Sequence, residues 1–187
     1  MRKIIYYVAS SLDGFISGPD DDVSDFVYTG SGVEQYLNDL KSFDTVIMGR
    51  STYEFGYQFG VAPGDPSPTY PHMKHYIFSN NLKLEQLHPQ VAIKKLELHE
   101  INKLKEEEGT DIYLCGGGQL AGWLLDHQKI DLLKIKLNPL ILGEGTRLFG
   151  QSVAKHKLQL VDSEGHENGL QLMTFRIVYE TVDYPEA

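Results

Sequence analysis

The sequence has a single cysteine, Cys115, among 187 residues, so no disulfide can form within the chain. None of its seven histidines stands with Cys, carboxylate or another His in the spacing of a zinc site, and we expect no metal. No apolar run approaches the ~20 residues that a membrane-spanning helix needs. The N-terminus also lacks the pattern of a cleaved secretory signal. These absences predict a cytoplasmic protein with no membrane partner.

Positive charge is scarce as well, because 17 Lys and Arg stand against 26 Asp and Glu, for a formal net charge of −9. Nucleic-acid binding needs a basic surface to neutralise phosphates, so we exclude nucleic acid as a partner. A phosphorylated small ligand stays open, since it needs only a local positive site. Hydrophobic residues make up 41% and charged residues 23%, which is typical of a globular chain. The length suits one domain over residues 1–187.

Strand and helix patterns alternate along most of the chain. Short apolar runs predict buried strands, and these cover residues 4–9, 45–48, 75–78, 91–93 and 112–115. Cys115 lies in the last of them and is expected to be a small core residue. Helical spacing follows Ser31, Leu98 and Gly118. Ser31 with Glu34, and Ser51 with Glu54, have the spacing of a capping box at a helix start.

The final third of the sequence predicts strands without helices. Leu133, Ile135 and Leu137 alternate with lysines, which indicates a half-exposed strand. Lys157–Val161 and Leu170–Val182 predict two strands of a hairpin, joined through Asn168-Gly169. The whole order favours one α/β domain with a mainly parallel central sheet and an antiparallel hairpin at one edge.

Two turns have the same form: a buried strand ends in glycine and a helix begins. The first is Met48-Gly49-Arg50-Ser51-Thr52, and the second is Cys115-Gly116-Gly117-Gly118-Gln119. A helix N-terminus presents free N–H groups, and glycine lets a phosphate approach them closely. Arg50 adds a permanent cation. Two such turns on one sheet edge could hold the two ends of a dinucleotide.

Asp13 follows the first strand, at the edge where open α/β sheets bind ligands. A partly buried carboxylate there could have a raised pKa and pass a proton. Alternatively, Asp13-Gly14 is a turn in which Asp13 accepts backbone hydrogen bonds. Five tyrosines could stack on a planar ring, although we expect most of them to serve core and rim packing instead: Tyr6, Tyr7, Tyr53, Tyr57 and Tyr70.

Met48-Gly49-Arg50-Ser51-Thr52-Tyr53-Glu54 resembles the Met-Gly-Arg-x-Thr-aromatic-Glu turn of dihydrofolate reductases. Ser11-Leu12-Asp13-Gly14 and the stretch from Ile130 to Phe149, with Asn138-Pro139 and Gly143-Glu144-Gly145, resemble the reductase domain of the bifunctional riboflavin-biosynthesis protein. The sequence is thus similar to a stand-alone member of the dihydrofolate-reductase-like family. That resemblance implies a three-layer α/β fold.

The resemblance also implies NADPH bound along the strand ends. Gly49, Arg50, Ser51 and Thr52 would face the adenosine phosphates, with Arg50 toward the 2′-phosphate, and Ser79 would line the adenosine side. The pyrophosphate would lie on Gly116, Gly117, Gly118, Gln119 and Leu120. The backbone of Val8 and Ala9 would meet the nicotinamide, and Asp13 would be the catalytic residue. A homodimer through the sheet edge and residues 137–149 is expected.

The function implied is an NADPH-dependent reductase of a small heterocycle, resembling 5-amino-6-(5-phosphoribosylamino)uracil reductase. One alternative is a dihydrofolate reductase, although the loop Pro19–Phe26 contains no Trp where those enzymes carry Pro-Trp. The other alternative is a non-catalytic nucleotide-binding protein on the same fold.

Overall fold

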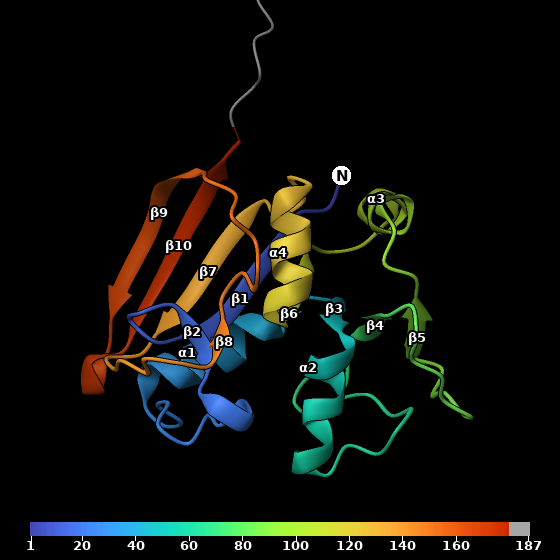
Figure 1. Ribbon diagram of the computed structural model, residues 1–187, viewed down its shortest axis with the longest axis horizontal. Helices are drawn as coiled ribbons and strands as arrows, with labels where there is room; N and C mark the ends of the chain where they lie inside the picture. Colours follow the sequence, from blue (N-terminus) through green and yellow to red (C-terminus); the bar gives the residue numbers. More distant parts are fainter. Residues whose placement is uncertain (180–187) are drawn as a thin grey trace, which may run out of the picture.

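The structure, a computed structural model, describes residues 1–179. One eight-stranded sheet has the order β5-β4-β3-β6-β1-β7-β10-β9, and a two-stranded sheet of β2 and β8 lies beside it (Figure 1). The strands are β1 (Ile4–Ser10), β2 (Phe15–Ser17), β3 (Thr45–Gly49), β4 (Lys74–Phe78), β5 (Val91–Lys94), β6 (Ile112–Gly116), β7 (Leu132–Leu137), β8 (Thr146–Arg147), β9 (Lys157–Gly165) and β10 (Gln171–Val178). The helices are α1 (Ser31–Leu40), α2 (Arg50–Phe55), α3 (Leu98–Glu106) and α4 (Gly118–Asp126).

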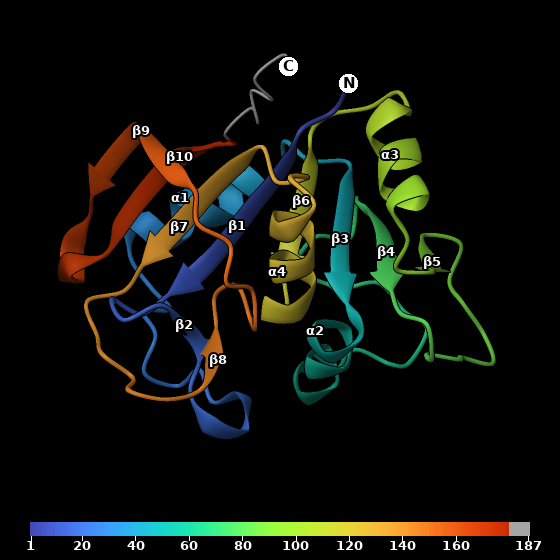
Figure 2. The ribbon, with the colours of Figure 1, turned by 45° about the horizontal axis from the view of Figure 1, so that its top comes forward.

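Six neighbouring strands, from β5 to β7, run parallel, and β10 and β9 complete the sheet as an antiparallel hairpin. This arrangement confirms the predicted fold class. Figure 2 shows the arrows of the parallel strands pointing toward the same edge. That edge therefore collects the turns that follow β1, β3, β4 and β6. Val182, the predicted end of the last strand, lies outside the described residues.

Helices cover both faces of the sheet and make three layers. Alternate residues of one strand enter different cores, so Tyr6 packs with α3 and α4, while Tyr7 packs with the side that carries α1 and α2. Both tyrosine side chains are fully buried. This explains why the first strand is apolar along its whole length: a central strand with two covered faces has no polar side.

Neither predicted capping box forms. Gly30 is the N-cap of α1 and Gly49 is the N-cap of α2, and neither cap has a side-chain hydrogen bond. At α1 the free N–H of Ser31 instead donates to Oε1 of Glu167 at 2.8 Å. A carboxylate from the hairpin turn, distant in the sequence, thus replaces the local cap. The residues around Ser31 could not indicate this long-range contact.

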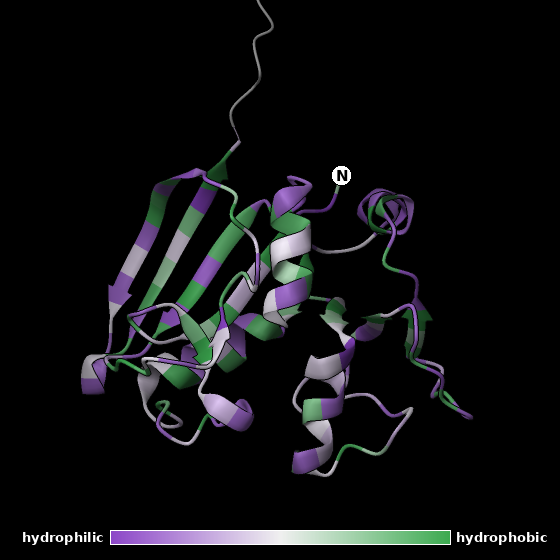
Figure 3. Ribbon diagram, in the orientation of Figure 1, coloured by the Kyte–Doolittle hydropathy of each residue, from purple (hydrophilic) through white to green (hydrophobic). Residues whose placement is uncertain are grey.

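The prediction that both lysines of β7 lie on an exposed face is wrong at Lys136, although four of the six residues of the strand are of intermediate exposure. Figure 3 shows the strand banded in apolar and hydrophilic colours, yet Lys136 is only 6% exposed. Lys134 forms an ion pair with Asp39 of α1. The strand lies between β1 and β10, so both of its neighbours and the helix above it remove the lysines from water.

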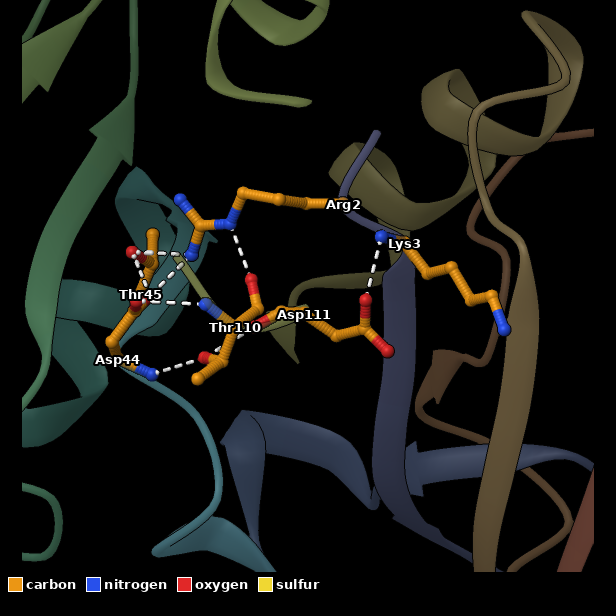
Figure 4. Close-up of polar contacts among 6 residues, drawn as sticks. All are labelled: Arg2, Lys3, Asp44, Thr45, Thr110 and Asp111. Atoms are coloured by element: carbon orange, nitrogen blue, oxygen red, sulfur yellow. Dashed lines mark hydrogen bonds and ion pairs between the residues drawn. The ribbon is translucent and has the colours of Figure 1, made fainter. Parts of the chain in front are cut away.

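The amino ends of the strands are joined by a polar cluster around Arg2 (Figure 4). The guanidinium of Arg2 pairs with the Asp44 carboxylate, donates to the carbonyl of Thr110, and donates to Oγ1 of Thr45 at 2.9 Å. The N–H of Thr110 donates to Asp44 at 2.9 Å. These contacts fix β1, β3 and β6 to one another at the edge opposite the glycine turns.

Within residues 1–179, no helix combines the length and the apolar character required to cross a bilayer.

Candidate functional site

The two glycine turns lie side by side. Strands β3 and β6 are parallel neighbours, and Met48 is the register partner of Gly116. Their following helices, α2 and α4, therefore start at the same edge of the sheet. A Cβ added to Gly117 would lie 2.8 Å from Oγ1 of Thr52, so the turns are in contact. Both turns thus lie at one edge of the sheet, as the predicted parallel arrangement requires.

The three glycines of the second turn have different roles. Gly116 and Gly117 have φ of 147° and 75°, which side-chain-bearing residues rarely adopt. Gly118 is needed for packing instead, because a Cβ there would lie 2.1 Å from the carbonyl oxygen of Arg147. The next residues, Gln119 and Leu120, lie in the first turn of α4, where backbone N–H groups have no partner within the helix. The Leu120 side chain is buried in the core.

The first turn presents polar groups to solvent. Arg50 is half exposed, and its Nε donates to Oε1 of Glu54 one helical turn later at 2.8 Å. Ser51 is exposed, and Thr52 faces the second turn. Gly49 makes no close approach that would require glycine, since a Cβ there would meet Leu120 only at 3.7 Å.

Ser79 follows β4 at the same edge. Its hydroxyl accepts hydrogen bonds from the N–H groups of Asn81 at 3.2 Å and Leu82 at 3.0 Å. The side chain therefore closes its own turn, and it is exposed at an intermediate level.

A cavity of about 400 Å³ opens beside these turns, on the face of the sheet that carries α1 and α2. Val8 and Ala9 of β1 and Thr52 of α2 line it, so three of the predicted cofactor residues border the cavity. The lining does not include the other predicted cofactor residues, which are Gly49, Arg50, Ser51, Ser79 and the Gly116–Leu120 turn. The cavity volume is in the usual range for small-molecule sites.

Aromatic residues make up much of the cavity wall. Tyr53 and Tyr70, two of the five tyrosines considered for ring stacking, contribute to it, whereas Tyr6 and Tyr7 do not. The sequence did not single out Tyr36 and Tyr113, whose hydroxyls lie 2.7 Å apart. Burial raises the pKa of both phenols, so they are neutral hydrogen-bonding groups at physiological pH.

Cys115 is half-buried: it packs against the core cluster, as expected, and it also lines the cavity, which was not expected. Its Sγ lies 3.3 Å from the hydroxyl of Tyr70, and burial raises the pKa of the thiol. His75 also reaches the wall. Its Nε2 accepts from the Ser67 N–H at 3.1 Å, its Nδ1 faces the Met73 carbonyl at 3.0 Å, and desolvation lowers its pKa to about 4. The imidazole is therefore neutral.

The pKa of Asp13 is lowered, whereas the sequence predicted a raised pKa. Its carboxylate accepts hydrogen bonds from the Ser11 hydroxyl at 2.6 Å and from the N–H groups of Leu142 and Gly143 at 3.1 and 2.7 Å. These bonds, the Ser11 one foremost, lower its pKa to about 2, and the residue is exposed and outside the cavity lining. The expected raised pKa is wrong, because the segment after Pro139 folds back onto the carboxylate. The geometry favours the turn interpretation.

No group of three or more His, Cys, Asp or Glu in the described part of the chain is arranged to hold a metal ion.

Two glycine turns on neighbouring parallel strands, an aromatic cavity at the same edge and a closing antiparallel hairpin define an α/β protein of the dihydrofolate-reductase-like class. Residues 2–172 match the model of the RibD C-terminal domain. The chain belongs to that family.

The chain also has a full-length relative and solved structures with the same fold. The chain is similar to YwjB of Bacillus subtilis (strain 168), itself uncharacterized, with 31% identity over 91% of this chain and 96% of that protein. A candidate riboflavin biosynthesis protein from Shewanella sp. PV-4 has the same fold, with a TM-score of 0.73, 21% identity, and coverage of 95% of this chain and 99% of that chain.

A third neighbour is a diaminohydroxyphosphoribosylaminopyrimidine deaminase/5-amino-6-(5-phosphoribosylamino)uracil reductase from Thermotoga maritima. The TM-score is 0.72 at 16% identity. The match covers 95% of this chain but only 57% of that protein, so this chain corresponds to little more than half of it.

Proposed function

We propose that this protein is an NADPH-dependent reductase of a small heterocyclic compound. Membership of the RibD C-terminal domain family supports an oxidoreductase, and the Thermotoga neighbour is named in part as a uracil-compound reductase. The observation that carries the proposal is the position of the cavity. It borders Val8, Ala9 and Thr52, and Thr52 contacts the second glycine turn, so one ligand can reach from the turns to the cavity.

The residues of the edge fit a dinucleotide. The turn at Gly116 and Gly117 is free of side chains and leads into the N-terminus of α4, where N–H groups can donate to a pyrophosphate. Arg50 begins α2 directly after β3 and is half exposed, so its guanidinium can bind a 2′-phosphate. NADPH would supply the hydride, and the protein's part would be to bind and orient both compounds and to exclude water from the cavity.

Calorimetric titration with NADPH and NADH tests this proposal. We expect NADPH to bind, and Arg50→Ala to weaken NADPH binding about tenfold while changing NADH binding little, because a charge-assisted phosphate contact contributes about 1.5–3 kcal/mol. Arg176→Ala is the matched control, since Arg176 is an exposed arginine of β10, on the far side of the sheet order from β3. If neither nucleotide binds to the wild-type protein, the proposal is wrong.

We also propose a homodimer formed through the exposed edge of the sheet. β9 is the last strand in the sheet order, and its Leu158, Leu160 and Val161 are 48%, 54% and 53% exposed. An edge strand with apolar side chains and unpaired backbone groups favours pairing with another chain. Light scattering after size exclusion tests this, and Leu160→Lys should give a monomer; a wild-type monomer would contradict it.

A further inference from the structure

The cavity carries almost no charge. Among the described residues, 1–179, the lining includes one lysine, Lys136, and one histidine, His75. It includes neither a carboxylate nor an arginine of that part of the chain. His75 is neutral, because two backbone groups hold its ring nitrogens and desolvation lowers its pKa. Two arginines lie outside the lining: Arg50, which we assign to the 2′-phosphate of the nucleotide, and Arg147, whose guanidinium lies 5.9 Å from the Phe15 ring centroid.

Lys136 is an unusual residue for such a place. It is 6% exposed, and Nζ donates to the carbonyl oxygen of Val27 at 3.1 Å and lies 5.5 Å from the ring centroid of Tyr36. An ammonium group has three donors, and the Val27 carbonyl takes one of them. The side chain lines the cavity, so the remaining donors have a ligand within reach. Burial of a cation without a carboxylate is unfavourable unless further acceptors are supplied.

The position of Lys136 in the sheet links it to the proposed reaction. Lys136 is the register partner of Ala9 across β1 and β7, and Val8 and Ala9 border the cavity. A compound held against this part of β1 therefore lies within reach of the ammonium group. A hydrogen bond from the ammonium group to a carbonyl oxygen also withdraws electron density from the carbonyl carbon. The carbonyl compound is then easier to reduce.

The walls and the opening set the shape and polarity of the ligand. Tyr36, Tyr113 and Tyr70 present ring surfaces, and their hydroxyls already have partners in Tyr113 and Cys115. Tyr28 and Phe59 line the cavity and are 56% and 63% exposed, so aromatic groups also stand at its opening. Exposed aromatic surface around a cavity is typical of a site for a flat apolar compound.

Resting on the proposed function, we infer that the cavity binds a flat ring compound without a phosphate group, whose carbonyl oxygen accepts a hydrogen bond from Lys136. A phosphate monoester carries up to two negative charges at neutral pH, and a single lysine would leave one of them buried without a partner. The substrate class therefore differs from the phosphoribosyl compound in the name of the Thermotoga protein.

A matched pair of probes tests the inference on the whole protein without any nucleotide. 7-Methoxy-4-methylcoumarin is a flat uncharged carbonyl compound, and 4-methylumbelliferyl phosphate has the same ring with a phosphate in place of the methoxy group. Calorimetry should show that the methoxy compound binds at least about tenfold more tightly, because burying an uncompensated charge is costly. Absence of binding by the methoxy compound, or equal or tighter binding of the phosphate, overturns the inference.

Lys136→Met then tests the anchoring residue. It should weaken binding of the methoxy compound at least about tenfold, because it removes the charge-assisted hydrogen bond to the carbonyl oxygen. Lys134→Met is the control, because Lys134 lies on the same strand and pairs with Asp39 but does not line this cavity. Unchanged affinity in a folded Lys136→Met protein, or an equal loss in both variants, overturns the role of Lys136.

The two proposals fail separately. If NADPH binds but the phosphate probe outcompetes the methoxy compound, the reductase proposal stands and the substrate class is wrong. If the methoxy compound binds through Lys136 but neither nucleotide binds, the cavity assignment stands and the reductase proposal is wrong.

Discussion

Replacing Gly117 by alanine perturbs the point where the two glycine turns meet. Gly117 has φ 75° and ψ 124°, a backbone conformation outside the regions that residues with a Cβ favour. The added methyl group would also lie 2.8 Å from Oγ1 of Thr52, which is closer than Cβ atoms approach other atoms. The substitution therefore strains the backbone and displaces Thr52.

The expected loss of stability follows from these two effects. A residue held in a sparsely populated region costs about 1–3 kcal/mol, and moving Thr52 off its preferred rotamer adds about 0.5–1.5 kcal/mol. We expect the free energy of unfolding to fall by about 2–4 kcal/mol, which for a chain of this size lowers Tm by roughly 4–16 °C. Because the methyl group also occupies the cradle proposed for the pyrophosphate, NADPH affinity should fall at least about tenfold.

Urea unfolding and calorimetry measure the two effects, and Gly60→Ala is the control. Gly60 has φ 84° and ψ 12° with no atom within 4 Å of an added Cβ, so it isolates the backbone cost, about 1–2 kcal/mol. Gly60→Ala should leave NADPH affinity unchanged. Equal destabilisation by both variants would refute the contact with Thr52, and full NADPH affinity in Gly117→Ala would refute the cradle.

Three further outcomes follow from the same structure. The pKa of Asp13 is about 2 against an ordinary 3.8, so its hydrogen bonds stabilise the protein above about pH 4, and this contribution is lost as pH falls from about 4 to 2. Asp13→Asn should therefore make the urea midpoint depend less on pH in this interval. An identical dependence in both proteins would contradict the hydrogen bonds to the Asp13 carboxylate. Arg2→Met should lower the free energy of unfolding by about 2–3 kcal/mol, because it removes the guanidinium from the Asp44 carboxylate and the Thr110 carbonyl. Arg50→Met, at an exposed i,i+4 pair, should lower it by under about 0.5 kcal/mol. Equal losses in the two variants would show that the Arg2 cluster is no stronger than an exposed ion pair. Iodoacetamide should alkylate Cys115 much more slowly than free cysteine at neutral pH, because burial raises the pKa of the Cys115 thiol. An alkylation rate equal to that of free cysteine would show that the thiol is open to solvent.

Much of the fold and part of the site could be predicted from local patterns. The run of apolar residues in β1, the glycine after β3 and β6, and Asn168-Gly169 in the hairpin are each short-range signals with a direct physical cause. Parallel strands then place their carboxyl ends at one edge, so both glycine turns could be expected there without coordinates, whereas their contact depends on β3 and β6 being neighbours. Val8, Ala9 and Thr52 border the cavity as a consequence.

Other features depend on partners that are distant in the sequence. Ser31 with Glu34 has the pattern of a capping box, but Glu167 takes its place. Asp13 was expected to have a raised pKa, but the backbone of residues 142–143 folds onto it and lowers that pKa. In both cases an unrelated segment supplies the hydrogen bond, and no local pattern reports such a contact.

The sequence by itself determined the α/β class, the mainly parallel sheet and the edge at which the glycine turns gather, because these follow from the periodicity of apolar residues and from glycine at strand ends. Only the tertiary structure decided what that edge can recognise. Lys136 has the alternation of a half-exposed strand residue, and its burial depends on β1, β10 and α1 closing around it. The charge of a cavity is a property of all the segments that surround it, so it exists only once they have packed.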